Sequence, residues 1–319
     1  LALDGNPLRT PPPEVIARGQ SDVSDYLQDL SQGYVTRYEA KLLVVGEGAT
    51  GKTSLLRALR GEPFFEGLAA THGIDIKPLS FPHPHRPSVN MTLNVWDFGG
   101  QQIYHATHQF FMTKRSLYLL IWNARANAEQ ARLDHWLAKI HVLAPEAPVI
   151  LVATHIDQCP AELNYTRFKE AYPQLAGHVL VSNKDGRGID RLKELISHEA
   201  TSLPLMEQDW PGSWVKAETY LRNDARHHLS RAEYVDICND QGVSEEIAAT
   251  AFGGYLHDLG KILYFQDDDT LGDFVILKPN WLSQAISRVF DDVATRQNGG
   301  VLAVSYTHLR AHETSSMIS

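Results

Sequence analysis

One loop fixes the architecture of this chain: Gly46-Glu47-Gly48-Ala49-Thr50-Gly51-Lys52-Thr53, followed by Ser54. The apolar run at residues 40–45 predicts a buried strand before it, and residues 54–59 have helical spacing after it. A glycine-rich turn in this place directs backbone N–H groups into one concavity at the positive end of a helix dipole. Lys52 then reaches the β- and γ-phosphates and Thr53 ligates Mg²⁺. The sequence therefore predicts that the chain binds a nucleoside triphosphate.

Three later segments indicate which nucleotide is bound. Asp97 ends the strand at residues 90–96 and precedes Gly100, so it can hold a Mg²⁺-bound water while the glycine N–H meets the γ-phosphate. Asp157 follows the apolar run at residues 148–153 and can accept both N–H groups of a guanine edge. A third strand at residues 178–181 ends in a segment placed to cover the base, Ser182-Asn183-Lys184.

The order of these four loops resembles the small-GTPase (Ras-like) family over about residues 40–202. The resemblance implies an α/β fold with a six-stranded, mostly parallel sheet and bound GTP or GDP. It matches Thr71 to the switch threonine that senses the γ-phosphate through Mg²⁺, and Gln101 to the glutamine that orients the attacking water. Catalysis is thus assigned to Gln101, Lys52 and Thr71, and the metal to Thr53, Thr71 and Asp97.

One segment departs from the Ras-like pattern. The family usually has Asn-Lys-x-Asp where this chain has Thr154-His155-Ile156-Asp157. His155 is shorter than lysine and cannot cover the base edge in the same way, so guanine preference rests mainly on Asp157. Packing at the strand end is the alternative role for Thr154 and His155, and a solvated position at a helix start is the alternative for Gln101.

Composition agrees with a cytosolic protein of two domains. The chain has 319 residues, 43% of them hydrophobic, which suffices for packed cores. The net charge of −9 argues against general affinity for nucleic acid or an anionic membrane. Two cysteines without metal-like spacing suggest a reduced cytoplasmic compartment. No apolar run approaches the ~20 residues of a membrane span. The chain starts at Leu1 without Met, so a true N-terminus is expected to be missing.

Histidines occur near two of these loops. Residues 73–81 and 90–96 predict a hairpin joined by a proline-rich loop at 82–88. His83 and His85 in that loop lack an evident third metal ligand and are expected to be exposed. His105 and His108 follow Gln101 on a helix, where they are expected to face solvent or a partner.

The N-terminal 39 residues predict two short units. Residues 1–8 fit one leucine-rich repeat, L-x-L-x-x-N-x-L, followed by a proline-marked end, so residues 1–19 are interpreted as the last repeat of an array cut away upstream. An ordinary apolar loop is the alternative. Residues 20–39 are interpreted as a linker helix, with apolar positions between residues 21 and 30.

Residues 205–304 predict a second, α+β domain. Helical patterns cover residues 214–229, a segment begun by a Ser230–Glu233 capping box, and a segment from Ser244 to 259. A hairpin at residues 262–277 and a last helix from Pro279 follow. This order is similar to a winged helix, but 8 Lys/Arg against 16 Asp/Glu argue against a DNA-binding role.

The whole order resembles the Roco family, in which a GTPase domain called Roc precedes a domain called COR. The motifs shared are residues 97–101, 104–111, 154–157 and 255–260. The resemblance implies homodimerisation through COR and protein partners bound by leucine-rich repeats. It also implies that the second half of COR is missing here. Residues 305–319 fit neither family nor domain and are interpreted as an artefactual or disordered tail.

Two functions follow from these patterns. The first is a regulatory GTPase that hydrolyses GTP to GDP and phosphate with Mg²⁺ and is controlled by COR-mediated dimerisation. The second is a nucleotide-dependent scaffold with negligible hydrolysis. Turnover per molecule at increasing protein concentration distinguishes them.

Overall fold

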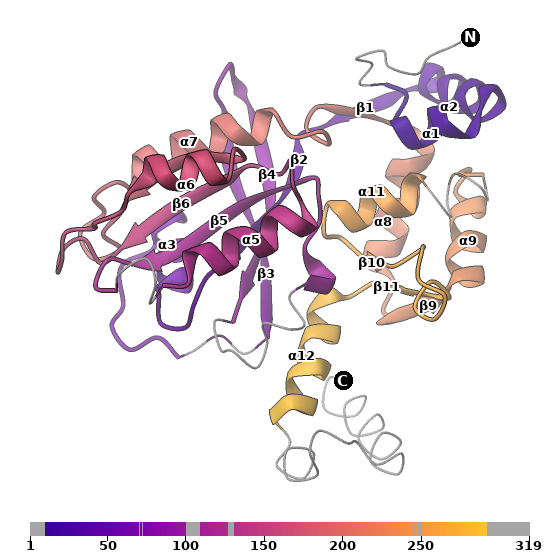
Figure 1. Cartoon of the computed structure of the whole chain (residues 1–319). Helices are drawn as coiled ribbons and strands as arrows, with labels where there is room; N and C mark the ends of the chain where they lie inside the picture. The colour runs from indigo at the N-terminus through magenta and orange to yellow at the C-terminus, as the bar shows by residue number, and fades with distance from the viewer. Residues whose placement is uncertain are drawn as a thin grey trace.

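The computed structural model describes residues 10–69, 71, 73–99, 109–126, 131–244, 247 and 251–291. Figure 1 shows a central sheet with helices on both faces, a smaller trailing domain beside it, and α12 (Pro279–Asp291) extending from that domain beneath the sheet. Gly100, Gln101, His105 and His108 lie outside the described residues, as do residues 1–9 and 305–319. No helix in the described part of the chain is long and apolar enough to cross a membrane.

The central sheet has six strands in the order β3-β4-β2-β5-β6-β7. β3 is antiparallel to β4, and the other four pairings are parallel, which confirms the predicted mostly parallel sheet. Because β2 lies between β4 and β5, the strand order reverses at β2, and ligands of such sheets bind beyond the carboxyl ends of the strands there. The strands are β2 (Glu39–Val45), β3 (Ile74–His83), β4 (Arg86–Phe98), β5 (Ser116–Asn123), β6 (Val149–Thr154) and β7 (Leu175–Leu180).

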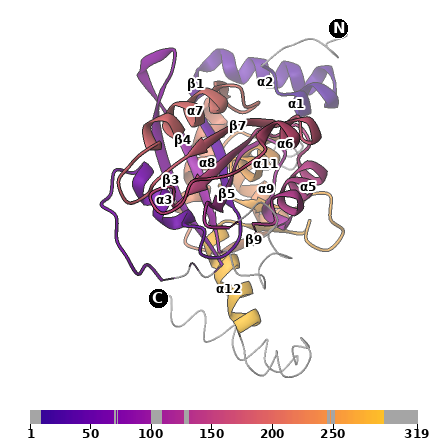
Figure 2. The same ribbon diagram turned by 60° about the vertical axis from the view of Figure 1, so that its left-hand side comes forward.

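Both faces of this sheet are buried. Leu42 and Val44 of β2 pack with α3 (Lys52–Leu59) and α7 (Ile189–Thr201), whereas Leu43 and Val45 pack with α5 (Leu133–Leu143) and α6 (Tyr165–Ala171). Figure 2 shows the two helix pairs on opposite sides of the strands. A strand covered on both faces needs apolar residues at every position, which explains the continuous apolar run before the phosphate loop.

The hairpin of β3 and β4 is longer than predicted. The strands extend to His83 and from Arg86, so the prediction of a loop at residues 82–88 is wrong. β3 is an edge strand with one neighbour in the sheet. Proline has no N–H to donate, so Pro78 and Pro82 are tolerated in this strand because it has no second neighbouring strand.

The prediction for His83 is also wrong, because its side chain is buried at the end of this hairpin. His83 Nδ1 accepts from the His85 backbone N–H at 3.1 Å, and Nε2 lies 2.8 Å from Glu207 Oε1. Since Nδ1 accepts, the proton lies on Nε2 and is donated to the carboxylate. His85 is exposed, as predicted.

The trailing domain contains α8 (Gly212–Asn223), α9 (Arg231–Asp240), α11 (Gly253–Asp258) and the antiparallel sheet β10-β11-β9. This sheet consists of β9 (His228–Ser230), β10 (Leu263–Tyr264) and β11 (Phe274–Ile276). The winged-helix-like order and the Ser230–Glu233 capping box are as predicted. The helix predicted over residues 214–229 instead ends at Asn223, where the Asp224 carboxylate accepts from the Arg226 N–H and turns the chain into β9.

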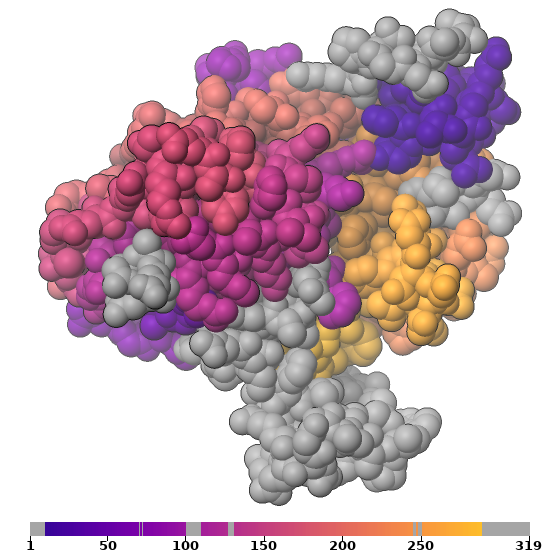
Figure 3. All heavy atoms as spheres, in the orientation of Figure 1, coloured from indigo at the N-terminus to yellow at the C-terminus, as the bar shows by residue number. Residues whose placement is uncertain are grey.

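The N-terminal segment joins the trailing domain. α1 (Pro13–Arg18) and α2 (Gln20–Gln32) precede β1 (Tyr34–Arg37), which pairs antiparallel with β8 (Gln208–Pro211). The linker expected to be helical over residues 20–39 is therefore a helix followed by a strand. Tyr26 packs against Trp214 with ring centroids 5.5 Å apart and donates to the Asp209 carbonyl at 2.7 Å. Figure 3 shows these indigo residues lying against the orange trailing domain.

The central and trailing domains are joined by direct contacts. Gly260 has φ +70° and lies so close to the Trp96 indole that a Cβ would overlap the ring. Asn94 Nδ2 donates to the Leu259 carbonyl at 2.9 Å. Lys261 Nζ lies 2.5 Å from Glu39 Oε2, in a partly buried ion pair between the domains.

Candidate functional site

The predicted phosphate loop connects β2 to α3 at the point where the strand order reverses. Gly46 has φ +137°, and a Cβ there would overlap the Ile121 carbonyl oxygen. Gly51 has φ +82° and is the N-cap of α3. Ala49 has φ +56°, a conformation that non-glycine residues seldom adopt. The loop is thus held in a geometry in which its amides and the start of α3 can surround an anion.

Lys52 is buried at the centre of this loop. Its Nζ donates to the Gly46 and Glu47 carbonyls at 2.9 and 2.8 Å. Burial lowers the pKa of Lys52 to about 8, against the attraction of Asp97 and Glu47, which raises it. The ammonium is therefore a buried cation that the loop carbonyls hold. When a nucleotide binds, the same ammonium would also donate to phosphate oxygens.

Thr53, Thr71 and Asp97 meet beside Lys52. Thr53 Oγ1 donates to Asp97 Oδ2 at 2.7 Å and lies 2.8 Å from Thr71 Oγ1. Because Thr53 has one hydroxyl proton, Thr71 is the donor in the second contact. Burial raises the pKa of Asp97 to about 6, and Asp97 Oδ1 is buried without a hydrogen-bond partner among the described residues. Two hydroxyls and an unsatisfied carboxylate oxygen are oxygen ligands of the kind that Mg²⁺ prefers.

The segment after β6 is tied to the phosphate loop. Thr154 is buried, and its Oγ1 lies 2.7 Å from the Thr50 carbonyl and 2.9 Å from His155 Nδ1. His155 has φ +61°, and burial lowers the pKa of its imidazole, which favours the neutral form. Thr154 thus contacts the phosphate loop through its hydroxyl, whereas the next residues, His155 and Asp157, line the cleft.

The segment after β7 completes the same wall. Ser182 is buried and accepts at Oγ from the Asp185 N–H at 3.3 Å. Asn183 Nδ2 donates to the Gly51 carbonyl at 3.2 Å. Lys184 Nζ lies 3.8 Å from Glu66 Oε1, across the cleft. The structure therefore brings the two predicted base-contacting segments to one side of the phosphate loop.

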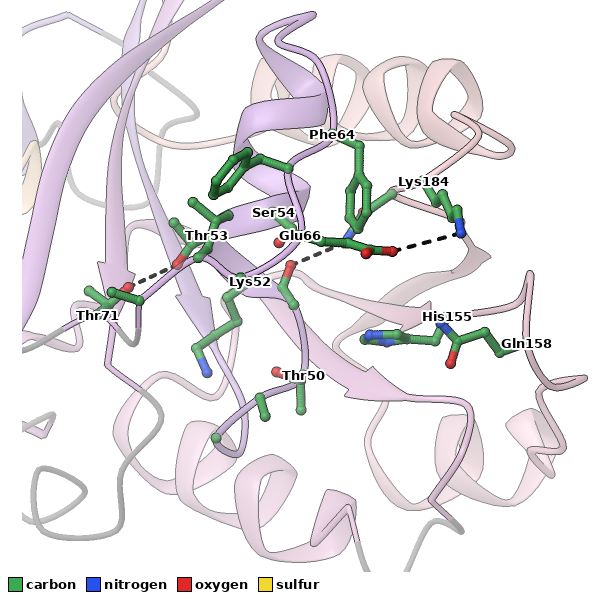
Figure 4. Close-up of a pocket in the computed structure, with 18 of the residues that line it drawn as sticks. Thr50, Lys52, Thr53, Ser54, Phe64, Glu66, Thr71, His155, Gln158 and Lys184 are labelled. Atoms are coloured by element: carbon green, nitrogen blue, oxygen red, sulfur yellow. Dashed lines mark hydrogen bonds and ion pairs between the residues drawn. The ribbon is translucent and has the colours of Figure 1, made fainter.

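These segments line a cleft of about 480 Å³. Figure 4 shows Lys52 and Thr53 on one side and His155, Gln158 and Lys184 on the other. The other described site residues do not line it: Gly46, Glu47, Asp97, Thr154 and Ser182. The predicted site residues that line it are Gly48, Ala49, Thr50, Gly51, Lys52, Thr53, Ser54, Thr71, His155, Asp157, Asn183 and Lys184.

Sequence reasoning missed the outer wall of the cleft. Phe64, Phe65 and Glu66 follow α3 and also line the cleft, and Figure 4 shows Glu66 reaching toward Lys184. Phe64 and Phe65 are 41% and 58% exposed, although a phenylalanine normally packs inside. Two adjacent aromatic residues in the Pro/Gly-containing loop between Lys52 and Thr71 were the available signal.

The fold and this cleft define a Ras-like GTPase domain followed by a winged-helix-like domain. Comparison with known families agrees. The family model "Ras of Complex, Roc, domain of DAPkinase" matches residues 41–157. The model "C-terminal of Roc, COR-A domain" matches residues 211–311.

Similar proteins cover both domains. The structure of Methanosarcina barkeri Roco2 RocCORdC bound to GDP matches with a TM-score of 0.77 and 33% identity, over 86% of this chain and 83% of that one. The chain belongs to the Roco family. It is 32% identical to the probable serine/threonine-protein kinase pats1 of Dictyostelium discoideum, over 95% of this chain and 10% of that protein. It is 29% identical to the Roc-COR-CHAT protease of Runella zeae, over 92% of this chain and 35% of that protein. The chain therefore spans about a tenth of the length of pats1 and about a third of the length of the Roc-COR-CHAT protease.

Proposed function

We propose that this chain binds GTP and hydrolyses it to GDP and phosphate with Mg²⁺, as a regulatory switch. The observation that carries the proposal is the convergence of the phosphate loop, the Thr53–Thr71–Asp97 cluster and the Asp157 loop on one cleft. The family supports it, because the similar Roco2 structure is bound to GDP.

Each wall of the cleft has a proposed task. The amides of the phosphate loop and Lys52 bind the β- and γ-phosphates, and Thr53, Thr71 and Asp97 hold the metal, which supplies charge neutralisation when bound. Asp157 accepts from the guanine edge, and Asn183 and Lys184 cover the base. Phe64 offers an exposed aromatic face for stacking, an arrangement that contributes about 1–3 kcal/mol per base in other proteins.

Catalysis in this site consists mainly of positioning and charge stabilisation. Lys52 neutralises charge on the transferred phosphoryl group. We assign the orientation of the attacking water to Gln101, which directly follows Gly100 in the sequence. No covalent step on the protein is required, so the loss of one orienting group should slow turnover and leave binding intact.

We therefore expect Gln101→Leu to bind GTP with the affinity of the unmodified protein and to hydrolyse it at least about tenfold more slowly. Single-turnover hydrolysis at saturating Mg²⁺, with the GTP Kd measured alongside, tests this. Equal hydrolysis rates in the two proteins would remove Gln101 from the mechanism.

Contacts from the trailing domain support the switch. Ser283 Oγ on α12 accepts from the Ile74 N–H at 2.6 Å, three residues after Thr71. Gly73 packs directly on Ser283 and Ser287, and its carbonyl accepts from the Gly99 N–H at 2.8 Å. A movement of Thr71 on nucleotide exchange would therefore reach α12 through a buried, hydrogen-bonded path.

Dimerisation through the trailing domain is the proposed level of control. If a second protomer assists hydrolysis, turnover per molecule should rise by about tenfold or more as the protein concentration passes the dimer dissociation constant. Hydrolysis measured across a concentration series, with the mass of the species followed by light scattering, tests this. A rate that stays flat and near zero would favour the scaffold function instead.

A further inference from the structure

The phosphate loop carries a carboxylate that nucleotide binding does not explain. Glu47 follows Gly46 in this loop, and its side chain is 16% exposed. Its backbone carbonyl faces the nucleotide side, where it accepts from Lys52 Nζ at 2.8 Å and from Thr50 Oγ1 at 3.0 Å. A carboxylate so close to a phosphate site would repel the ligand and attract the lysine, so its position matters.

Two residues at the start of α5 contact this carboxylate: Trp136 within the helix and Arg132, its N-cap. Trp136 is buried, and its Nε1 donates to Glu47 Oε1 at 3.0 Å. Arg132 NH1 lies 3.7 Å from the same oxygen. An indole N–H can only donate and a guanidinium is always charged, so Glu47 Oε1 accepts the Trp136 hydrogen bond and is the anionic partner of Arg132.

The backbone conformation of Arg132 supports a specific role for its contact with Glu47. Arg132 is the N-cap of α5 and has φ +52°, in the left-handed region. L-residues other than Gly, Asn and Asp occupy that region at a cost, and such strain concentrates at functional sites. This conformation places an arginine at the N-terminus of a helix, where the helix dipole disfavours a cation. The Glu47 carboxylate beside Arg132 offsets that unfavourable interaction.

We propose that Trp136 and Arg132 are positioning residues for nucleotide binding, which hold the Glu47 carboxylate on α5 and away from Lys52. The inference rests on the proposed function and adds a residue pair to it. Lys52 and Glu47 interact electrostatically even in the held position, since the Glu47 charge raises the pKa of Lys52. We call the contacts of Trp136 and Arg132 with Glu47 the latch. Without the latch, the Glu47 carboxylate would turn to Lys52 and compete with the phosphates for its ammonium.

The decisive experiment removes the latch and then the charge. Trp136→Phe keeps an aromatic ring on α5 but loses the N–H donor, and we expect the Kd for GDP to rise at least about tenfold. Glu47→Gln in that background removes the competing charge and should recover most of the lost affinity. Thermal unfolding of both proteins separates this effect from packing, because Glu47→Gln should not restore stability lost from the core.

Trp210→Phe is the matched control. Trp210 is a buried indole on β8, remote from the cleft, so its loss should lower stability and leave the GDP Kd unchanged. An unchanged Kd in Trp136→Phe, or a loss that Glu47→Gln does not reverse, would overturn the latch. Should Trp136→Phe not fold, Arg132→Gln with and without Glu47→Gln carries the same test. Failure of the unmodified protein to bind GDP would instead refute the proposed function.

Discussion

Replacement of Lys52 by alanine is expected to lower nucleotide affinity by at least about a hundredfold. The Lys52 ammonium is buried in the phosphate loop and is held by two carbonyls, Gly46 and Glu47. A bound triphosphate would exchange these for charge-assisted hydrogen bonds, each of which contributes about 1.5–3 kcal/mol. Loss of two such bonds lowers affinity by a factor of about 10² to 10⁴. The measurement is a GTP and GDP titration of both proteins by calorimetry.

Lys216→Ala is the matched control for this experiment, because Lys216 is exposed on α8 and far from the cleft in sequence and fold. It should bind GTP as the unmodified protein does. The folded state of Lys52→Ala is checked by its thermal unfolding. If Lys52→Ala retained the affinity of the unmodified protein, the loop between β2 and α3 would not be the phosphate site.

Much of the fold was predictable because its signals are local. The phosphate loop, the apolar runs of β2 and β6, and the Ser230–Glu233 capping box each depend on residues within a few positions of one another. Parallel strands buried on both faces leave a continuous apolar signature that needs no knowledge of their partners. The strands were therefore readable from local patterns, and their arrangement in a six-stranded, mostly parallel sheet was implied by the resemblance to Ras-like GTPases.

The errors concern pairings between distant parts of the chain. His83 is buried because Glu207, more than a hundred residues later, supplies an acceptor for its ring. The strand β1 exists because β8 pairs with it, although Thr36 and Asp209 of these strands are 173 residues apart. The latch between Glu47 and Trp136 spans 89 residues. The residue pattern within one segment does not predict such contacts, because the stabilising interaction comes from a partner that is distant in the sequence.

The proposed selection of guanine depends on the segment that departs most from the Ras-like pattern. Asp157 lines the cleft on the same wall as His155 and Asn183. A carboxylate can accept the two N–H groups of a guanine edge, whereas adenine does not offer that pair. Thr154 Oγ1 donates to the Thr50 carbonyl and ties this segment to the phosphate loop, and we propose that Asp157 reads the base despite the histidine at position 155.

Asp157→Asn should therefore change the preferred nucleotide. An amide accepts at one atom and donates at the other, so one guanine N–H would face a donor, and we expect GTP affinity to fall by about 2–4 kcal/mol, or about 30- to 1,000-fold. Xanthosine triphosphate should bind the variant more tightly than GTP, because its carbonyl at position 2 can accept from the new amide. Competition of GTP, ATP and xanthosine triphosphate against a fluorescent nucleotide measures all three affinities.

The same titration of the unmodified protein decides the guanine assignment. ATP should compete poorly with GTP, and Asp134→Asn, which changes an exposed carboxylate on α5, should leave the ranking of the three nucleotides unaltered. If Asp157→Asn lowered the affinity for GTP without raising the affinity for xanthosine triphosphate, the Asp157 carboxylate would stabilise the loop and would not contact the base. Equal affinity of the unmodified protein for ATP and GTP would contradict guanine selection altogether. Glu66, the other carboxylate in the described lining of the cleft, pairs with Lys184.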